Sequence, residues 1–393
     1  MGCCFTCGCV LELVVSRVRF ARVSCPRLRL RKSMKQTLHT RGATARRVAP
    51  PQRMDISDMS ALKKQCMTSP LWTGKHVLSC DQFDEAMLHV LFETASAMKA
   101  MVATKRKSAI LTGRVLANIF YEPSTRTMCS FDAAMKRLGG DVISVSESSS
   151  SAKKGETIED TVRCLECYCD ILVLRHPVKG TAAQAASAMK KPLINAGDGV
   201  GEHPTQALLD LFTVVSAHPR AKSTAEGLQL DSLTLTLLGD LKHGRTVHSI
   251  ARLVTKLSRP PTLHLVSPAL LSMPAEICDE LAKANVPMKA SDDFAAALPA
   301  ADVLYVTRVQ KERFATEAEY AAVAGSYVVN AAALAAGPAK SDMLIMHPLP
   351  RVDEISTDVD ADPRATYFIE MENGMYVRMA LLALVLGADL SAL

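Results

Sequence analysis

Short apolar runs alternate with amphipathic stretches along most of the chain after residue 110. The short runs indicate buried strands. In the stretches between them the apolar residues recur at helical spacing, which indicates helices that pack one apolar face on a sheet. Strands are predicted at 115–120, 141–145, 170–174, 192–195, 233–238, 262–266, 303–307, 327–330 and 343–346. Helices are predicted at 124–138, 157–169, 181–190, 203–217, 246–257, 275–284 and 373–386. Repeated strand–helix–strand units of this kind predict parallel sheets with helices on both faces.

The strand–helix rhythm stops at the long apolar helix 203–217 and restarts near residue 232. We therefore predict an α/β protein with two doubly wound parallel-sheet domains joined by helices, which a chain of 393 residues is long enough to form. The predicted division is a first domain at 54–202 and a second at 203–372. The last helix, 373–386, is expected to pack back on the first domain.

Residues 1–53 form a basic leader that we exclude from the predicted fold. They hold twelve Lys and Arg and one acid, Glu12, so of the net charge of +6 the leader carries +11 and the rest −5. The leader fits three interpretations: N-terminal acylation at Gly2-Cys3-Cys4, an organellar transit peptide, or sequence that is not translated or is trimmed, with a start at Met34 or Met54. We favour the third, which an intact-mass measurement on native protein would test.

The remaining composition argues against several classes of protein. A mildly acidic globular part suggests no nucleic-acid partner, and no apolar run reaches the ~20 residues of a membrane span. Cys164, Cys167 and Cys169 approach a metal-binding spacing, but no second pair of ligands follows them. We interpret the cysteines as buried thiols of a reducing compartment and predict a cytoplasmic protein without a metal site, the leader leaving organellar targeting open.

Polar clusters follow the predicted strands, where an open α/β sheet presents its binding site. Ser124-Thr125-Arg126-Thr127 opens a helix after the first strand, and helix N–H groups, hydroxyls and a guanidinium together favour a phosphate. A simple helix cap is the alternative, although a cap needs only one hydroxyl. Arg175 follows another strand, where by itself it could be an ordinary surface residue.

Three further clusters follow later strands. His203 and Gln206 open a helix and lie three residues apart on one face. Arg245-Thr246 opens a helix in the second half, and Arg308 and Gln310 follow another strand. The last cluster is 347–351, whose prolines predict a rigid loop with carbonyl groups that can accept hydrogen bonds from an amino or amide group, or merely a stiff turn. A common cleft with these arginines and no matching run of acids suits a phosphate and carboxylates.

From about residue 68 to 386 the chain resembles the aspartate transcarbamoylases of the aspartate/ornithine transcarbamoylase superfamily. The motifs that carry this resemblance are Ser-Thr-Arg-Thr at 124–127, Lys-Lys-Gly-Glu at 153–156, His-Pro-Thr-Gln at 203–206, Gly-Arg-Thr-Val-His-Ser at 244–249, Thr-Arg-Val-Gln-Lys-Glu-Arg at 307–313 and His-Pro-Leu-Pro-Arg at 347–351.

The resemblance implies transfer of the carbamoyl group from carbamoyl phosphate to L-aspartate in de novo pyrimidine synthesis, without a metal or cofactor. It implies that carbamoyl phosphate is bound by Ser124, Thr125, Arg126, Thr127, Arg175, His203, Gln206 and the carbonyl groups of Leu349 and Pro350. Of these, Arg126, Thr127, Arg175 and His203 are the implied catalytic residues. Aspartate would be held by Lys154, Arg245, Thr246, Arg308 and Gln310. In the family the lysine loop comes from a neighbouring subunit, so a homotrimer with shared sites is expected.

Two departures from the family pattern stand out. Glu202 precedes His203, where bacterial relatives have a neutral amide, and the serine-rich loop before Lys153 is shorter than in those relatives. The serine at the family's loop position is therefore open, and Ser151 is our choice. Ornithine transcarbamoylase is the nearest alternative, but that branch typically has Cys where this chain has Pro348. A scaffold that lost its activity is a second alternative, and no motif residue is missing.

Overall fold

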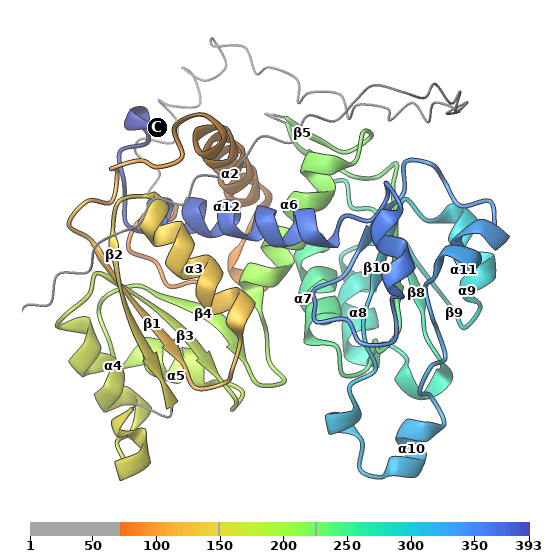
Figure 1. Ribbon diagram of the computed structural model, residues 1–393, viewed down its shortest axis with the longest axis horizontal. Helices are drawn as coiled ribbons and strands as arrows, with labels where there is room; N and C mark the ends of the chain where they lie inside the picture. The colour runs from red at the N-terminus through yellow and green to blue at the C-terminus, as the bar shows by residue number, and fades with distance from the viewer. Residues whose placement is uncertain (1–70, 148–149, 225) are drawn as a thin grey trace, which may run out of the picture. The chain divides into compact units, whose positions relative to one another are not determined.

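The computed structural model describes residues 71–147, 150–224 and 226–393. The predicted leader, and the possible starts at Met34 and Met54, lie outside these residues. Two parallel sheets organise the described chain (Figure 1). In the first sheet the strand order is β2-β1-β3-β4, and in the second it is β11-β10-β7-β8-β9. Both orders need crossovers through helices, as the alternating sequence pattern predicts.

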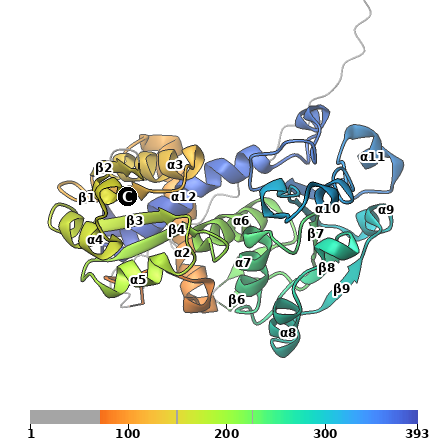
Figure 2. The same ribbon diagram turned by 90° about the horizontal axis from the view of Figure 1, so that it is seen from below.

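The first sheet consists of β1 (Val115–Phe120), β2 (Asp141–Ser146), β3 (Ile171–His176) and β4 (Leu193–Asp198). The helices of this half are α2 (Glu85–Lys105), α3 (Thr125–Arg137), α4 (Ile158–Glu166) and α5 (Thr181–Ser187). Figures 1 and 2 show α2 and α3 on one face of the sheet and α4 and α5 on the other. Helix α6 (Pro204–Ala217) then leads toward the second half.

The second sheet consists of β7 (Thr234–Leu238), β8 (Thr262–Val266), β9 (Met288–Ser291), β10 (Val303–Val306) and β11 (Leu344–Met346). A small antiparallel hairpin, β5 (Lys222–Thr224) and β6 (Gly227–Gln229), precedes it. Its helices are α7 (Arg245–Val254), α8 (Ala275–Lys283), α9 (Phe294–Ala297), α10 (Glu317–Ala321) and α11 (Ala331–Ala336). Short 3-10 helices are η1 (Cys80–Gln82), η3 (Ser151–Lys154), η4 (Ala269–Leu271), η5 (Leu298–Ala300), η6 (Lys311–Arg313), η7 (Thr357–Ala361) and η8 (Leu390–Ala392).

Helix α12 (Tyr367–Val385) returns from the second half to the first and packs against α2, α3 and α6. Figure 1 shows it running across both halves. One continuous apolar core joins α6 and α12 with one side of each sheet. Two smaller apolar cores lie on the other sides of the sheets. No described helix is both long and apolar enough to cross a membrane. The two predicted domain boundaries stay predictions.

Several predicted elements need correction. Residues 327–330 are not a strand, because Val329 makes only an isolated bridge to Ile355. The last helix begins at Tyr367, six residues before the predicted start. Strand β9 and helix α2 were not predicted; β9 is an edge strand with mostly exposed side chains, so it lacks an apolar run. The thiols of Cys129, Cys164 and Cys167 are exposed and not buried as expected, because α3 and α4 turn them toward solvent.

Candidate active site

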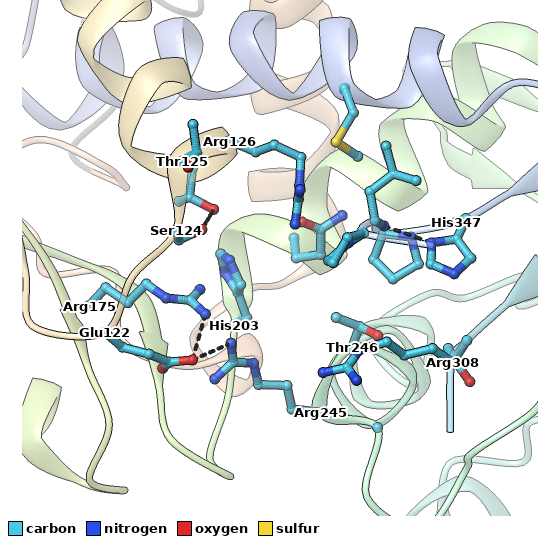
Figure 3. Close-up of a pocket in the computed structure, with 18 of the residues that line it drawn as sticks. Glu122, Ser124, Thr125, Arg126, Arg175, His203, Arg245, Thr246, Arg308 and His347 are labelled. Carbon is cyan, nitrogen blue, oxygen red and sulfur yellow. Dashed lines mark hydrogen bonds and ion pairs between the residues drawn. The ribbon is translucent and has the colours of Figure 1, made fainter. Parts of the chain in front are cut away.

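A cavity of about 550 Å³ lies where the carboxyl ends of six strands, β1, β3, β4, β7, β10 and β11, converge. Helix α12 closes it from one side (Figure 3). The cavity brings together every predicted site residue of both halves except two. Its lining includes Ser124, Thr125, Arg126, Thr127, Arg175, His203, Gln206, Arg245, Thr246, Arg308, Gln310, Leu349 and Pro350.

The start of α3 forms an anion-binding corner of the cavity. Ser124 has extended backbone at the N-cap position, but its side chain makes no capping hydrogen bond to the helix. Its hydroxyl donates instead to Thr127 Oγ1 at 3.1 Å. The first-turn N–H groups are therefore not taken up by the cap that was the alternative interpretation, and they carry the positive end of the helix dipole. This geometry favours a phosphate, with the Arg126 guanidinium beside it.

Arg175 is the most deeply placed cation on the first-sheet side. It is 7% exposed, and its guanidinium donates to the Ala196 carbonyl at 3.1 Å and to Glu122 Oε1 at 2.8 Å. Burial and the neighbouring charge of Arg245 lower the pKa of Arg175 to about 10, against the opposite effect of Glu122. Its Nε–H is buried and has no partner among the described residues.

Glu122 joins the two halves of the cavity through its carboxylate. It accepts from Arg175 of the first sheet at 2.8 Å and from Arg245 of α7 at 3.5 Å, as the dashed lines in Figure 3 show. Arg245 also donates to the Gly199 carbonyl after β4. These bonds fix Arg245 across the gap between the halves, so that it faces a ligand bound on the Arg175 side.

His203 is a neutral group in this cationic setting. Its backbone N–H donates to Ser249 Oγ at 3.3 Å, and the ring is 4% exposed with Nδ1 at 3.4 Å from Thr205 Oγ1. Burial, together with the charges of Arg175, Arg245 and Arg378, lowers the pKa of His203 well below 6.5. At neutral pH the imidazole is therefore uncharged and can donate one hydrogen bond to a polar neutral group.

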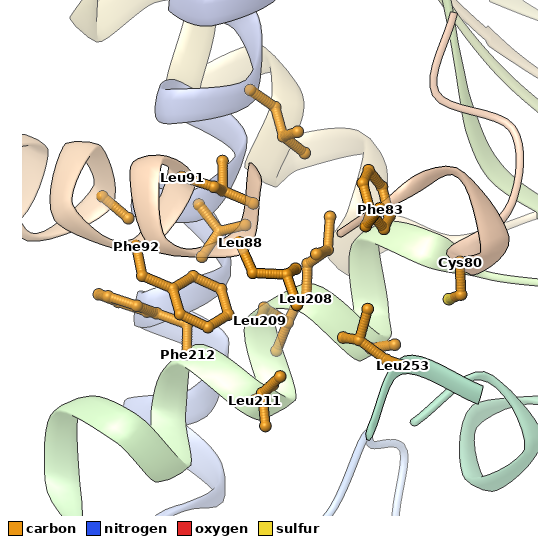
Figure 4. Packing of buried hydrophobic residues seen from close by; sticks show 14 of the residues in the cluster. Cys80, Phe83, Leu88, Leu91, Phe92, Leu208, Leu209, Leu211, Phe212 and Leu253 are labelled. Atoms are coloured by element: carbon orange, nitrogen blue, oxygen red, sulfur yellow. The ribbon is translucent and has the colours of Figure 1, made fainter. Parts of the chain in front are cut away.

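Gln206 and His203 depend on the packing of α6. The apolar side chains of this helix, among them Leu208 and Phe212, are buried against α2 and α12 (Figure 4). Phe212 packs on Phe92 with ring centroids 5.6 Å apart. Burial of such side chains stabilises the helix by roughly 1.5–3 kcal/mol each. This packing fixes the position of the first turn of α6 at the cavity.

The second-sheet side contributes groups suited to carboxylates. Arg308 follows β10 and lines the cavity half-buried. Gln310 is anchored by two bonds, from its backbone N–H to Asp240 Oδ2 at 3.3 Å and from its side-chain amide to the His243 carbonyl at 3.1 Å. This anchoring orients the loop that carries Arg308, so that both side chains face the same side of the cavity.

The loop 347–350 is held by the His347 ring. Its Nδ1 accepts from the Leu349 N–H at 2.8 Å, so its Nε2 carries the hydrogen and donates to Glu354 at 2.7 Å. Leu349 has a positive φ of 52°, rare for a residue with a β-carbon, and the Leu349–Pro350 peptide is cis. The loop forms one rim of the cavity.

Four cavity residues with a charged or imidazole side chain were not among the predicted site residues: Glu122, Arg313, His347 and Arg378. Arg378 is 4% exposed on α12, donates to Ser130 Oγ at 2.9 Å and stacks 5.1 Å over the Phe131 ring. Burial lowers its pKa to about 10. The sequence feature that could have identified Arg378 is that it is a lone arginine in the apolar helix 373–386, since charged residues are seldom buried without a partner.

Ser151 and Lys154 do not line the described cavity. Lys154 is exposed on η3, which follows β2 at the edge of the first sheet, and the side chain of Ser151 lies outside what the structure describes. Glu202, the departure beside His203, accepts from Ser79 Oγ at 2.8 Å and from the Cys80 N–H at 2.7 Å, which ties the loop to η1. In the described ranges no three His, Cys, Asp or Glu side chains gather as a metal site would require.

We predict that His203 stays neutral at about pH 6, because the folded site disfavours its protonated form. In the unfolded chain the same ring takes up a proton below about pH 6.5. This residue therefore adds to the loss of stability as pH falls below that value. NMR of isotope-labelled histidines, with the His203→Gln variant to assign the signal, measures this. A His203 signal that titrates with an ordinary pKa would contradict the prediction.

Comparison with known proteins identifies the family of this chain. The family model described as aspartate/ornithine carbamoyltransferase, carbamoyl-P binding domain, matches residues 75–216, and the Asp/Orn binding domain of the same family matches residues 231–385. The chain is 45% identical over 317 residues to the aspartate carbamoyltransferase catalytic subunit of Thermococcus gammatolerans, which covers 80% of this chain and 99% of the relative.

A second relative is much longer. The chain is 51% identical over 315 residues to the multifunctional protein pyr1-3 of Dictyostelium discoideum, and the match covers 80% of this chain but only 14% of that protein. Among solved structures, aspartate transcarbamoylase from Trypanosoma cruzi in complex with carbamoyl phosphate and aspartate is 41% identical, with a TM-score of 0.73 over 80% of this chain and 98% of that one. The relatives from Thermococcus and Trypanosoma are named as aspartate carbamoyltransferases, and this chain belongs to the aspartate/ornithine carbamoyltransferase family.

Proposed function

We propose that this protein is an aspartate carbamoyltransferase that transfers the carbamoyl group of carbamoyl phosphate to the amine of L-aspartate, in pyrimidine synthesis. The observation that carries this proposal is the cavity in which six guanidinium groups face the N-terminus of α3 and a neutral histidine. Carbamoyl phosphate brings a phosphate, and aspartate brings two carboxylates. A cationic cavity of this kind matches both substrates in charge.

On the first-sheet side, the start of α3 and Arg126 receive the phosphate of carbamoyl phosphate. Arg175, Thr127 and His203 donate to the carbamoyl oxygen, and Gln206 with the carbonyl groups of Leu349 and Pro350 binds the carbamoyl amino group. The depth of Arg175 in the cavity supports this placement. Arg245, Arg308 and Gln310 hold the carboxylates of aspartate on the other side.

In the reaction, the amine of aspartate attacks the carbamoyl carbon, and the C–O bond to phosphate breaks. The carbonyl oxygen gains negative charge, which Arg175, Thr127 and His203 stabilise with hydrogen bonds. Arg126 and the α3 N-terminus stabilise the leaving phosphate, which can take the amine proton. No covalent intermediate is required, so positioning and electrostatics account for catalysis.

We also propose a homotrimer with active sites shared between subunits. Lys154 and its neighbour Lys153 are exposed at the outer edge of the first sheet, away from the cavity of their own chain. Such a pair reaches an aspartate carboxylate only in the cavity of a second copy, together with a serine of the same loop such as Ser151. A cytoplasmic location is the companion proposal, which the free thiols of the described cysteines support.

The direct test is formation of carbamoyl aspartate from carbamoyl phosphate and aspartate, followed by a colorimetric assay. We expect turnover with aspartate and none with ornithine, because ornithine would place a cation beside Arg308 and Arg245. Activity with ornithine alone would assign the chain to the other branch of its family. No turnover with either substrate, in a folded protein, would favour a scaffold that lost catalysis.

Arg308→Ala is expected to raise the aspartate KM by at least about 30-fold, because losing a desolvated charged contact costs roughly 2–5 kcal/mol. The KM for carbamoyl phosphate should change little, since Arg126 and Arg175 bind it on the other side of the cavity. Lys311→Ala is the matched control, because Lys311 lies on the same loop but is exposed and pairs with Glu317. An unchanged aspartate KM with a lowered melting temperature would mean that Arg308 is structural, for instance paired with Glu312.

Shared sites predict complementation between inactive variants. Lys154→Ala and Arg126→Ala chains are each expected to be inactive, yet a mixed trimer contains one site in which both residues are native. Mixing the two variants under conditions of subunit exchange should therefore restore part of the activity. Exchange demonstrated by mass spectrometry without any recovered activity would mean that Lys154 acts in its own chain or not at all.

A further inference from the structure

Two carboxyl groups lie buried beside the cavity, between α6 and α12. Asp210 is one helical turn after Gln206 on α6, and Glu370 is in the first turn of α12. Each is 0% exposed. Neither lines the cavity, so the reaction does not use them directly.

Asp210 is a well-satisfied acceptor. Gln206 Nε2 donates to its Oδ1 at 2.8 Å, and the Tyr305 hydroxyl of β10 donates to its Oδ2 at 2.8 Å. Arg378 on α12 adds a favourable charge nearby. These partners stabilise the ionised form of Asp210, and its pKa is raised by burial only to about 6.

Glu370 is satisfied on one oxygen only. Its Oε2 accepts from the backbone N–H of His347 at 3.0 Å, while its buried Oε1 has no donor among the described residues. A buried carboxylate oxygen without a donor beside a second carboxylate is costly. A proton on Oε1 removes both costs, because it neutralises Glu370 and makes Oε1 a donor toward Asp210. Burial and the charge of Asp210 raise the pKa of Glu370 well above 4.5, in agreement with this assignment.

We propose that Glu370 and Asp210 are positioning residues, in which the neutral carboxyl of Glu370 donates a hydrogen bond to the carboxylate of Asp210. This bond connects the loop at His347 and helix α12 with Gln206 on α6. It thereby sets the distance between the Gln206 amide and the rim at Leu349 and Pro350, the two groups assigned to the carbamoyl amino end. The inference rests on the proposed function for the roles of these groups.

The titratable and charged groups that face the pair are Tyr305 from β10, whose pKa is raised well above 10 by burial and the two acids, and Arg378 from α12. Burial and the charge of Arg175 lower the pKa of Arg378, and burial lowers the pKa of His347, whose backbone N–H donates to Glu370. Tyr305 and Arg378 therefore keep their charge state across the neutral range. The proton that Glu370 holds beside the carboxyl of Asp210 is therefore the one whose loss changes the charge of this pair.

The sign of the pH effect follows from this proton. Above its ordinary pKa the unfolded chain has lost the Glu370 proton, whereas the folded chain keeps it. Folding then takes up a proton, and stability falls as pH rises until it passes the raised pKa. At still higher pH Glu370 ionises in the folded protein, which places two negative charges together. The position of the Gln206 side chain, which is bonded to Asp210, then becomes less fixed.

The experiment compares the wild type with Glu370→Gln and the matched control Glu372→Gln, an exposed glutamate two residues along α12. Thermal melts from about pH 5 to about pH 9 measure the proton without requiring activity. The amide of Glu370→Gln donates the same hydrogen bond but does not titrate. We expect its melting temperature to fall less with rising pH than in the wild type, whereas Glu372→Gln should follow the wild type. Equal slopes in wild type and Glu370→Gln would overturn the proposal.

Kinetics test the positioning role. Glu370→Ala removes the donor and is expected to raise the KM for carbamoyl phosphate about tenfold, with the aspartate KM little changed. Glu370→Gln should restore the wild-type KM. If Glu370→Ala keeps the KM for carbamoyl phosphate, or the amide fails to rescue it, the positioning role is wrong. A wild type that shows the expected melts but no turnover would instead refute the proposed function while retaining the hydrogen bond.

Discussion

Mutual repulsion among arginines is the constraint on which this molecule depends. Six guanidinium groups line one cavity of the described chain, and Glu122 is the one acid among the lining residues. The pKa values of Arg175 and Arg378, lowered to about 10, express the cost of holding these cations in a partly desolvated space. The fold must supply enough stability elsewhere to keep them there before any substrate arrives.

That stability comes from the elements that carry the arginines. Apolar side chains of the two sheets form one continuous core with α6 and α12, so the two halves cannot drift apart without exposing it. Glu122 and Asp210 then offset part of the repulsion locally, the first between Arg175 and Arg245 and the second beside Arg378. In the proposed function a phosphate and two carboxylates offset the remainder when they bind, so part of the cost of gathering these cations becomes affinity for anionic substrates.

Sequence patterns predicted most of the parallel framework because buried strands of an α/β protein are continuous apolar runs. Strands β1 and β8 agree with their predicted bounds, whereas edge strand β9 has no such run and was missed. Thirteen predicted site residues meet in one cavity, since strand order alone brings carboxyl ends together. Glu122 and the Asp210–Glu370 pair were beyond this reasoning, because their importance depends on contacts between segments distant in the chain.

The positive charge of the arginines around His203 has two effects, because it attracts anions and also adds to burial in keeping the imidazole of His203 neutral. An imidazole with an ordinary pKa would be partly protonated near neutral pH and would add another cation to the cluster. Burial among the arginines prevents this, so His203 keeps a neutral ring. A carbamoyl group is itself neutral, and its oxygen becomes negative only as the amine attacks. In the proposed reaction Arg126, Arg245 and Arg308 bind groups that are charged from the start. Arg175, Thr127 and His203 instead interact most strongly when the oxyanion develops, which is where a hydrogen bond accelerates the reaction.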